Sequence, residues 1–243
     1  MSRALLVSDL HLAPERPQTS ERFFRFLREQ AVHAEALYVL GDLFEYWIGD
    51  DALDDPAEEV GRAVAQALAS LARAGVAVYL MRGNRDFLLG ARFCAEAGAQ
   101  LLEDPARAAP GGDAALLLHG DTLCTDDLDY QAWRRTARSA DWQRQFLARP
   151  LAERRRIVLG LREQSKAAVR AKPPQIMDVN EAAVRAAFRA HGVARMIHGH
   201  THRPARHAHE VDGRRCERWV LPDWYERGGY LAIDAEGPRL VTL

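Results

Sequence analysis

The feature that most constrains this chain is a repeated pattern in which a short apolar segment is followed by metal-binding residue types. The five segments span residues 4–8, 36–40, 76–81, 114–118 and 194–197, and each has the length of a buried β-strand. Helical patterns separate several of these segments along the chain. Strands that alternate with helices indicate an α/β fold.

The remaining elements follow from local signals. Helices are predicted from about Ser20, from Asp55-Pro56 to Gly75, and over residues 88–97 before Gly98. Two hairpins close the chain, over 208–221 and 230–243, with turns at Asp212-Gly213 and Glu236-Gly237. Hairpins at the end of an α/β chain predict mixed sheets rather than one purely parallel sheet.

An insertion of about seventy residues separates the fourth and fifth strands, which is far more than a crossover needs. We expect helices over residues 128–147, 151–169 and 180–191 in it, interrupted by Pro173-Pro174. The insertion, about 126–192, is either a set of solvent-exposed helices or a lid over an active site. We expect one domain, 1–243, that carries it.

The residues that follow the five segments are carboxylates, imidazoles and one amide. They are Asp9, His11, Asp42, Asn84, His119, His200 and His202. Loops beyond the carboxyl ends of strands form the ligand crevice of α/β folds, so these side chains are expected to converge. Nitrogen and oxygen donors without a thiolate favour ions such as Mn, Fe, Zn or Ni. The set suffices for two ions, and Asp42 is the candidate bridge because its strand is central.

Each of these motifs is weak when it stands alone. Asp9-x-His11 is a common pairing, and Gly41-Asp42 is a frequent turn. His200 and His202 are stronger evidence, because alternate residues of an extended segment point the same way. The whole set in order predicts a two-metal phosphoester or pyrophosphate hydrolase, in which the ions activate water and hold phosphoryl oxygens.

Composition excludes several other classes of protein. A formal net charge of −1 gives no general argument for binding nucleic acid. Cys94, Cys124 and Cys216 are odd in number and widely spaced, which argues against a disulfide framework or a CxxC zinc site. No apolar segment approaches the ~20 residues that span a bilayer, and the N-terminus lacks signal-peptide features. We therefore expect a soluble or peripheral protein.

The ordered motifs resemble those of the calcineurin-like metallophosphoesterases, with Arg85 in place of the usual His after Asn84. With Arg85 at that position, the longer motifs of this chain resemble those of the UDP-2,3-diacylglucosamine pyrophosphatases of lipid A biosynthesis. The motifs are SDLHL (8–12), VLGDLFEYWIGDD (39–51), RGNRDFLLG (82–90), LHGDTLCTDD (118–127), IMDVN (176–180) and MIHGHTHRP (196–204).

The resemblance implies a four-layer αββα sandwich of two mixed sheets with a helical lid, and two Mn²⁺ ions per chain. It implies that the first ion is held by Asp9, His11, Asp42 and His202. It implies that the second ion is held by Asp42, Asn84, His119 and His200.

The implied reaction is hydrolysis of the pyrophosphate bond of UDP-2,3-diacylglucosamine. Metal-activated water would attack the α-phosphorus and release UMP and 2,3-diacylglucosamine 1-phosphate. The resemblance also implies a manganese-dependent enzyme that lies peripherally on the cytoplasmic face of the inner membrane of a Gram-negative bacterium. We expect a monomer with no nucleic-acid partner.

The resemblance assigns catalytic roles to Arg85, Asn84 and Asp42. A guanidinium in the place of Arg85 can hold phosphate oxygens bidentately, and a surface-loop Arg is the alternative. The implied substrate contacts are Asn84, Arg85, Asp127, Ser165, Val169, Lys172 and His200. Val169 stands where the family often has Asn, so this contact departs from the pattern.

The insertion has two interpretations that the sequence leaves open. Its apolar residues either line a chamber for acyl chains or pack the insertion against the core: Trp133, Trp142, Phe146, Leu147, Ile157, Val158 and Leu161. Its Arg154-Arg155-Arg156 run either contacts anionic lipid headgroups or is a solvated face.

Two other functions compete with this one. The first is a metallophosphoesterase of soluble substrates, such as dinucleoside polyphosphates, cyclic nucleotides or nucleic acids, against which Arg85 and the insertion argue. The second is a binding scaffold that has lost its metals, which would lack ligands that this sequence retains.

Overall fold

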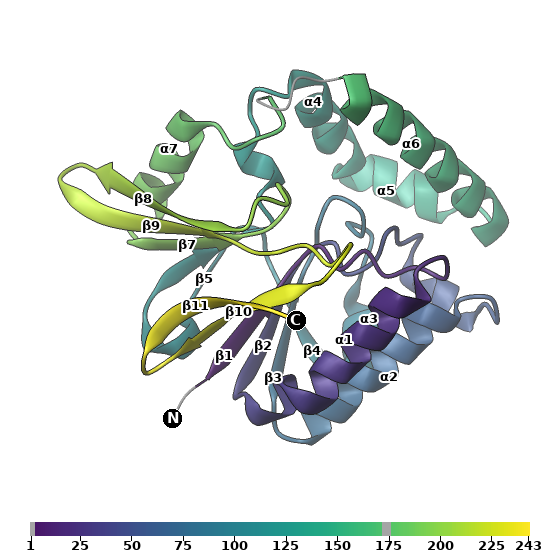
Figure 1. The fold of residues 1–243 in the computed structure, drawn as a ribbon. Coiled ribbons are helices and arrows are strands. Elements are labelled where there is room, and N and C mark those ends of the chain that lie inside the picture. The colour runs from purple at the N-terminus through teal and green to yellow at the C-terminus, as the bar shows by residue number, and fades with distance from the viewer. Residues whose placement is uncertain (1–2, 172–175) are drawn as a thin grey trace.

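Two β-sheets packed face to face form the centre of the molecule, and helices cover their outer faces (Figure 1). The architecture is that of a computed structural model, which describes residues 3–171 and 176–243. The first sheet contains β1 (Ala4–Val7), β2 (Ala36–Leu40), β3 (Ala77–Met81), β4 (Ala99–Leu102), β10 (Gly229–Asp234) and β11 (Gly237–Thr242). The second contains β5 (Ala106–Ala108), β6 (Ala115–Leu117), β7 (Arg195–His198), β8 (Ala205–Val211) and β9 (Arg214–Val220).

Strand pairing places the predicted ligand loops at one edge. The strand orders are β11-β10-β1-β2-β3-β4 and β5-β6-β7-β9-β8. Strands β1, β2 and β3 are parallel neighbours, as are β6 and β7, so their carboxyl ends point the same way. Antiparallel β10, β11, β5 and β8 make both sheets mixed, as predicted. The sequence did not predict β4 and β5, which are short and only partly buried and therefore carry no clear pattern.

Helices α1 (Pro17–Glu29), α2 (Glu59–Arg73) and α3 (Ala91–Ala97) cover the first sheet, and α7 (Glu181–His191) covers the second (Figure 1). Buried Phe23 and Leu68 pack with Leu5 on the first outer face. Phe188 packs with Met196 on the second. A third apolar cluster, which includes Leu6, Leu117 and Ile197, lies between the sheets. These layers form the four-layer αββα sandwich that the resemblance implied. The described residues also form four short 3₁₀ helices in the connections: η1 (Ala31–His33), η2 (Asp50–Asp54), η3 (Pro110–Gly112) and η4 (Asp121–Leu123).

Three helices of the insertion form a group that we call the cap: α4 (Leu128–Ala137), α5 (Ala140–Leu147) and α6 (Leu151–Ala171) (Figure 1). The predicted single helix over 128–147 is two helices, because the Ser139 side chain accepts a hydrogen bond from Trp142 N and begins α5. Arg138 of the cap donates to Gly83 O over 2.9 Å, which ties the cap to the loop after β3.

The arginine run of the insertion anchors the cap to the loop after β2. Arg154 is 2 % exposed, binds the Asp51 carboxylate, and donates to Ile48 O over 2.6 Å. Arg155 binds Asp55 over 3.0 Å. The lipid-headgroup interpretation therefore fails for Arg154, which is buried, whereas Arg155 is partly exposed beside Asp55. In the described part of the chain, no helix combines the length and the apolar character needed to cross a membrane.

Candidate dinuclear metal centre

Backbone strain is concentrated at the predicted ligands. Among the described residues, six that are not glycine have positive φ, and five of them are expected ligands: Asp9, His11, Asp42, His200 and His202. Such conformations cost free energy for residues with a Cβ and persist where the surrounding structure enforces them. The strand-end loops therefore hold these side chains in directions that relaxed loops would not give.

Two glycines let the loops approach one another closely. A Cβ on Gly83 would clash with the backbone and carboxylate of Asp42. A Cβ on Gly199 would clash with Ser8 and with the carboxylate of Asp9. Glycine at these positions brings the loops after β2 and β3 together, and likewise those after β1 and β7.

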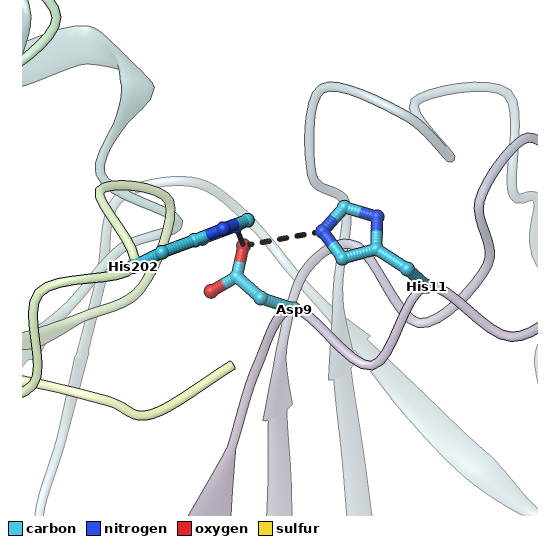
Figure 2. Close-up of side chains that lie close together, drawn as sticks. All are labelled: Asp9, His11 and His202. Carbon is cyan, nitrogen blue, oxygen red and sulfur yellow. Dashed lines mark hydrogen bonds and ion pairs between the residues drawn. The ribbon is translucent and has the colours of Figure 1, made fainter. Parts of the chain in front are cut away.

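The first cluster contains Asp9, His11 and His202, with Asp42 beside it. Figure 2 shows the carboxylate of Asp9 between the rings of His11 and His202. Asp9 Oδ1 lies 3.3 Å from His202 Nε2 and 3.9 Å from His11 Nε2, and His11 Nε2 lies 3.7 Å from Asp42 Oδ2. Donors that share an ion with bonds of about 2.1 Å lie roughly 3.0–3.4 Å apart, so only small shifts separate this cluster from a coordination sphere.

The second cluster contains Asn84, His119 and His200, again with Asp42 beside it. Asn84 Oδ1 lies 2.8 Å from His119 Nε2 and 2.9 Å from His200 Nδ1. Asp42 Oδ1 lies 3.7 Å from His119 Nε2. One oxygen of Asp42 thus faces each cluster, which is the arrangement that a bridging carboxylate requires.

The donor atoms fit divalent ions. The Nε2 atom of His11 is buried and has no hydrogen-bond partner among the described residues, which is rare for a buried polar atom. Burial disfavours the charged forms of Asp9 and of His119. Contact with His202 nevertheless holds the pKa of Asp9 well below its usual value. The carboxylates of Asp42 and Asp9 nevertheless raise the pKa of His119 to about 9. A concentration of carboxylates and imidazoles of this kind is suited to bind cations.

Further contacts orient the predicted ligands. Asp86, which is fully buried, accepts hydrogen bonds from Gly83 N over 2.7 Å and Leu43 N over 2.8 Å, and so joins two of the loops. His119 Nδ1 donates to Leu40 O over 2.9 Å, which turns Nε2 toward the second cluster.

A link runs from the first cluster to the cap. His11 Nδ1 lies 3.3 Å from Glu45 Oε2, and the other oxygen of Glu45 accepts a hydrogen bond from Arg162 of α6 over 2.7 Å. Carboxylates beside ligating imidazoles fix the orientation of the ring. The position of the cap is therefore connected to the side chain of His11.

A cavity of about 360 Å³, which we call the main cavity, opens beside both clusters. The predicted substrate contacts that line it are Asn84, Arg85, Asp127, Ser165 and His200. The Nε of Arg85 is buried and has no partner among the described residues. Lys172 and the side chain of Val169 lie outside the described residues.

Two aromatic residues at the site were not predicted. Tyr225, from the loop after β9, stacks on His11 with ring centroids 4.9 Å apart, and Arg16 lies 4.2 Å from the Tyr225 ring centroid. Tyr130 of α4 lines the main cavity and donates to Asp121 Oδ2 over 2.5 Å. No local sequence pattern marks either residue, because their contacts join segments far apart in the chain.

Comparison with known proteins agrees with this geometry. Residues 2–204 match the family described as calcineurin-like phosphoesterase. The chain belongs to the calcineurin-like phosphoesterase family. Within it, the chain is similar to proteins named UDP-2,3-diacylglucosamine hydrolase. The relative from Aromatoleum aromaticum is 51 % identical, with 97 % of this chain and 94 % of the relative covered. The relative from Stenotrophomonas maltophilia is 50 % identical, with 98 % of this chain and 98 % of the relative covered. The relative from Cellvibrio japonicus is 51 % identical, with 97 % of both chains covered.

Adding Mn²⁺ to the metal-free chain should raise its thermal unfolding midpoint. An ion that binds the folded chain at a free concentration of 100 times its Kd adds about 2.7 kcal/mol to the free energy of unfolding. Differential scanning calorimetry with Mn²⁺ or a chelator measures the shift, and Asp42→Asn should reduce it. An unchanged midpoint in the wild type at saturating Mn²⁺ would mean that the two clusters do not bind it.

Proposed function

We propose that this chain hydrolyses the pyrophosphate bond of UDP-2,3-diacylglucosamine, with two Mn²⁺ ions, to give UMP and 2,3-diacylglucosamine 1-phosphate. One observation carries the proposal: Asn84 and Arg85 line both the main cavity at the metal clusters and an aromatic cavity beneath the cap. A diphosphate bound at Arg85 would therefore lie between a dinuclear centre and this aromatic cavity. The names of relatives about 50 % identical over nearly their full length support the same substrate.

The residues divide the chemical work. When bound, the two ions would activate water and neutralise charge on the phosphoryl oxygens. Asp42 would hold both ions, with Asp9, His11 and His202 on the first and Asn84, His119 and His200 on the second. The guanidinium of Arg85 would bind the diphosphate bidentately, which gives its unpartnered Nε an acceptor.

The family resemblance implies attack on the α-phosphorus. Attack on either phosphorus of the diphosphate would expel a phosphate monoester, whose second pKa is about 6, so the leaving group departs at neutral pH without needing a proton. Asn84 and Arg85 lie where the two cavities meet and can orient the diphosphate for displacement in line with the attacking water.

The aromatic cavity supports a lipid substrate. Trp142 of α5 is its centre, with ring centroids 5.5 Å from Trp133, 4.9 Å from Phe146 and 5.8 Å from Phe87. Of the seven residues that were expected either to line an acyl chamber or to pack against the core, five line this cavity: Trp133, Trp142, Phe146, Val158 and Leu161. Four of the seven, Phe146, Trp142, Ile157 and Val158, pack in or against the core, as the second interpretation expected. The volume of the cavity is about 60 Å³, which is too small for an acyl chain, so an acyl chain would enter only if the cap moved outward.

Trp142→Ala should raise KM for the diacylated substrate about tenfold, which corresponds to about 1.4 kcal/mol of lost apolar contact. It should change kcat less than about threefold, because Trp142 lies away from the metal clusters. Steady-state kinetics in detergent micelles measures both constants. Val32→Ala, at an exposed apolar position of η1 outside the cap, is the matched control and should leave KM unchanged. A loss confined to kcat would argue against an acyl-binding role.

A peripheral position on the cytoplasmic face of the inner membrane, with the chain acting as a monomer, is part of the proposal. Its support is the cap, because four of the large apolar side chains that are exposed in the described chain lie on it or at its start: Leu128, Trp133, Leu147 and Leu159. Such side chains favour contact with a lipid surface from which an acylated substrate is drawn.

The test of the function is UMP release from UDP-2,3-diacylglucosamine in detergent with Mn²⁺. We expect turnover, and little activity on dinucleoside polyphosphates or a generic phosphodiester. Turnover of the generic ester alone would favour a phosphoesterase of soluble substrates. Loss of both activities, with no bound metal, would favour a binding scaffold.

A further inference from the structure

A second polar cavity, of about 240 Å³, lies beside the main cavity at the β8–β9 hairpin, and we call it the hairpin cavity. Its lining residues that matter here are Asp178, Thr201, Arg203, His207 and Arg218. Thr201 and Arg203 also line the main cavity, so the two cavities share a wall. None of the predicted ligands or substrate contacts lines the hairpin cavity.

Arg218 in β9 determines the charge of this cavity. It is only 6 % exposed, and its Nη1 donates to His198 Nε2 over 3.1 Å. His198 Nδ1 in turn donates to Gly199 O over 2.9 Å, so the ring accepts at Nε2 and is neutral. The contact with His198 therefore adds no negative charge beside Arg218, and the carboxylates of Asp178 and Glu181 act on Arg218 from beyond ion-pair distance.

No carboxylate in residues 3–171 and 176–243 lies within ion-pair distance of Arg218. Asp178, an acidic residue that lines the cavity, binds Arg203 and accepts from Val179 N over 2.8 Å. The four residues between the described ranges include no acidic one. A buried charge that is not paired is costly, so a guanidinium held in this way favours a bound anion.

The other polar atoms of the cavity wall specify what kind of anion fits. Arg218 Nε and Thr201 Oγ1 are buried and have no hydrogen-bond partner among the described residues. Both can donate, and a guanidinium forms its strongest contacts with planar or tetrahedral oxyanions. We propose that the hairpin cavity is an oxyanion-binding site, centred on Arg218, that takes inorganic phosphate or the phosphate group of a phosphate monoester.

The position of this site gives it a place in catalysis by a phosphoesterase. Thr201 stands between the predicted ligands His200 and His202, so an anion held by Thr201 and Arg218 lies next to the dinuclear centre. Hydrolysis of a phosphoester or a pyrophosphate yields a phosphate product, and the hairpin cavity offers it a binding site outside the metal coordination sphere. The charge and burial of Arg218 favour an anion in this cavity whatever the substrate of the dinuclear centre is.

Isothermal titration of the manganese-loaded full chain with inorganic phosphate tests the proposal. The wild type should bind two phosphates, one at the dinuclear centre and one in the hairpin cavity. Arg218→Gln, which keeps a donor toward His198, should lose one binding event or weaken it about tenfold or more. Arg215→Gln, an exposed arginine of the same strand, should keep both. Arg218→Lys keeps the charge without the guanidinium fork and should bind with intermediate affinity.

Parallel titrations with UMP and glucose 1-phosphate identify the source of the phosphate. If Arg218→Gln loses a binding event only for UMP or glucose 1-phosphate, the cavity binds the phosphate group of a monoester product. If it loses a binding event for inorganic phosphate, the cavity binds the free ion. A single binding event in the wild type for all three probes would overturn the proposal. Two unchanged events in Arg218→Gln would also overturn it, whether or not the chain turns over its substrate.

Discussion

Asp42→Asn should lower kcat for pyrophosphate hydrolysis by about a thousandfold, the largest effect that we expect from one substitution. One oxygen of Asp42 faces each cluster, at 3.7 Å from His11 Nε2 and 3.7 Å from His119 Nε2, so loss of its charge weakens both ion sites. Asparagine preserves the shape and can still accept the hydrogen bond that Arg85 N donates over 2.8 Å. The measurement is kcat at saturating substrate, together with metal content by mass spectrometry.

A surface substitution provides the control for Asp42→Asn. Asp54→Asn removes an exposed carboxylate that pairs with Arg92, and it should leave both turnover and metal content unchanged. The assignment of Asp42 as the bridge would be wrong if Asp42→Asn kept two ions and near-normal turnover. Loss of one ion with normal turnover would mean that a single-metal site performs the reaction.

Arg85→Ala should lower kcat/KM about a hundredfold while the metal content stays at the wild-type level. The Arg85 side chain lines the main cavity, and its buried Nε has no partner in the described structure, so a bound phosphate would supply the missing acceptor. Arg85→Lys should recover only part of the loss, because an ammonium restores the charge but not the bidentate fork.

Arg107→Ala, on edge strand β5, is the matched control for Arg85 and should change neither kinetics nor metal content. If Arg85→Ala lost bound metal in proportion to its loss of kcat/KM, Arg85 would act by supporting the metal clusters rather than by binding phosphate. Unchanged kcat/KM would show that Arg85 is only part of the cavity wall.

The sequence predicted the strand-end loops and their convergence because both depend on local patterns. Apolar runs of strand length predict buried strands, and parallel pairing then brings Asp9, Asp42 and Asn84 to one edge. The layers of the sandwich followed from the resemblance. The short strands β4 and β5 were missed, because three or four partly buried residues carry no period that stands out.

Contacts between distant segments could not be predicted in the same way. The stack of Tyr225 on His11 and the contact of Arg218 with His198 join residues that no local motif relates. The arginine run of the insertion was ambiguous for the same reason. Whether Arg154 faces lipid or Asp51 depends on how α6 packs against the loop after β2, which is set by tertiary structure.

The central claim is that water, activated at the dinuclear site, cleaves UDP-2,3-diacylglucosamine at its α-phosphorus. The most direct measurement is mass spectrometry of the products formed by the manganese-loaded chain in ¹⁸O-labelled water. One ¹⁸O atom should enter each UMP, and the 2,3-diacylglucosamine 1-phosphate should carry none. Label found only in the lipid phosphate would contradict attack at the α-phosphorus, and the absence of UMP would contradict the proposed substrate.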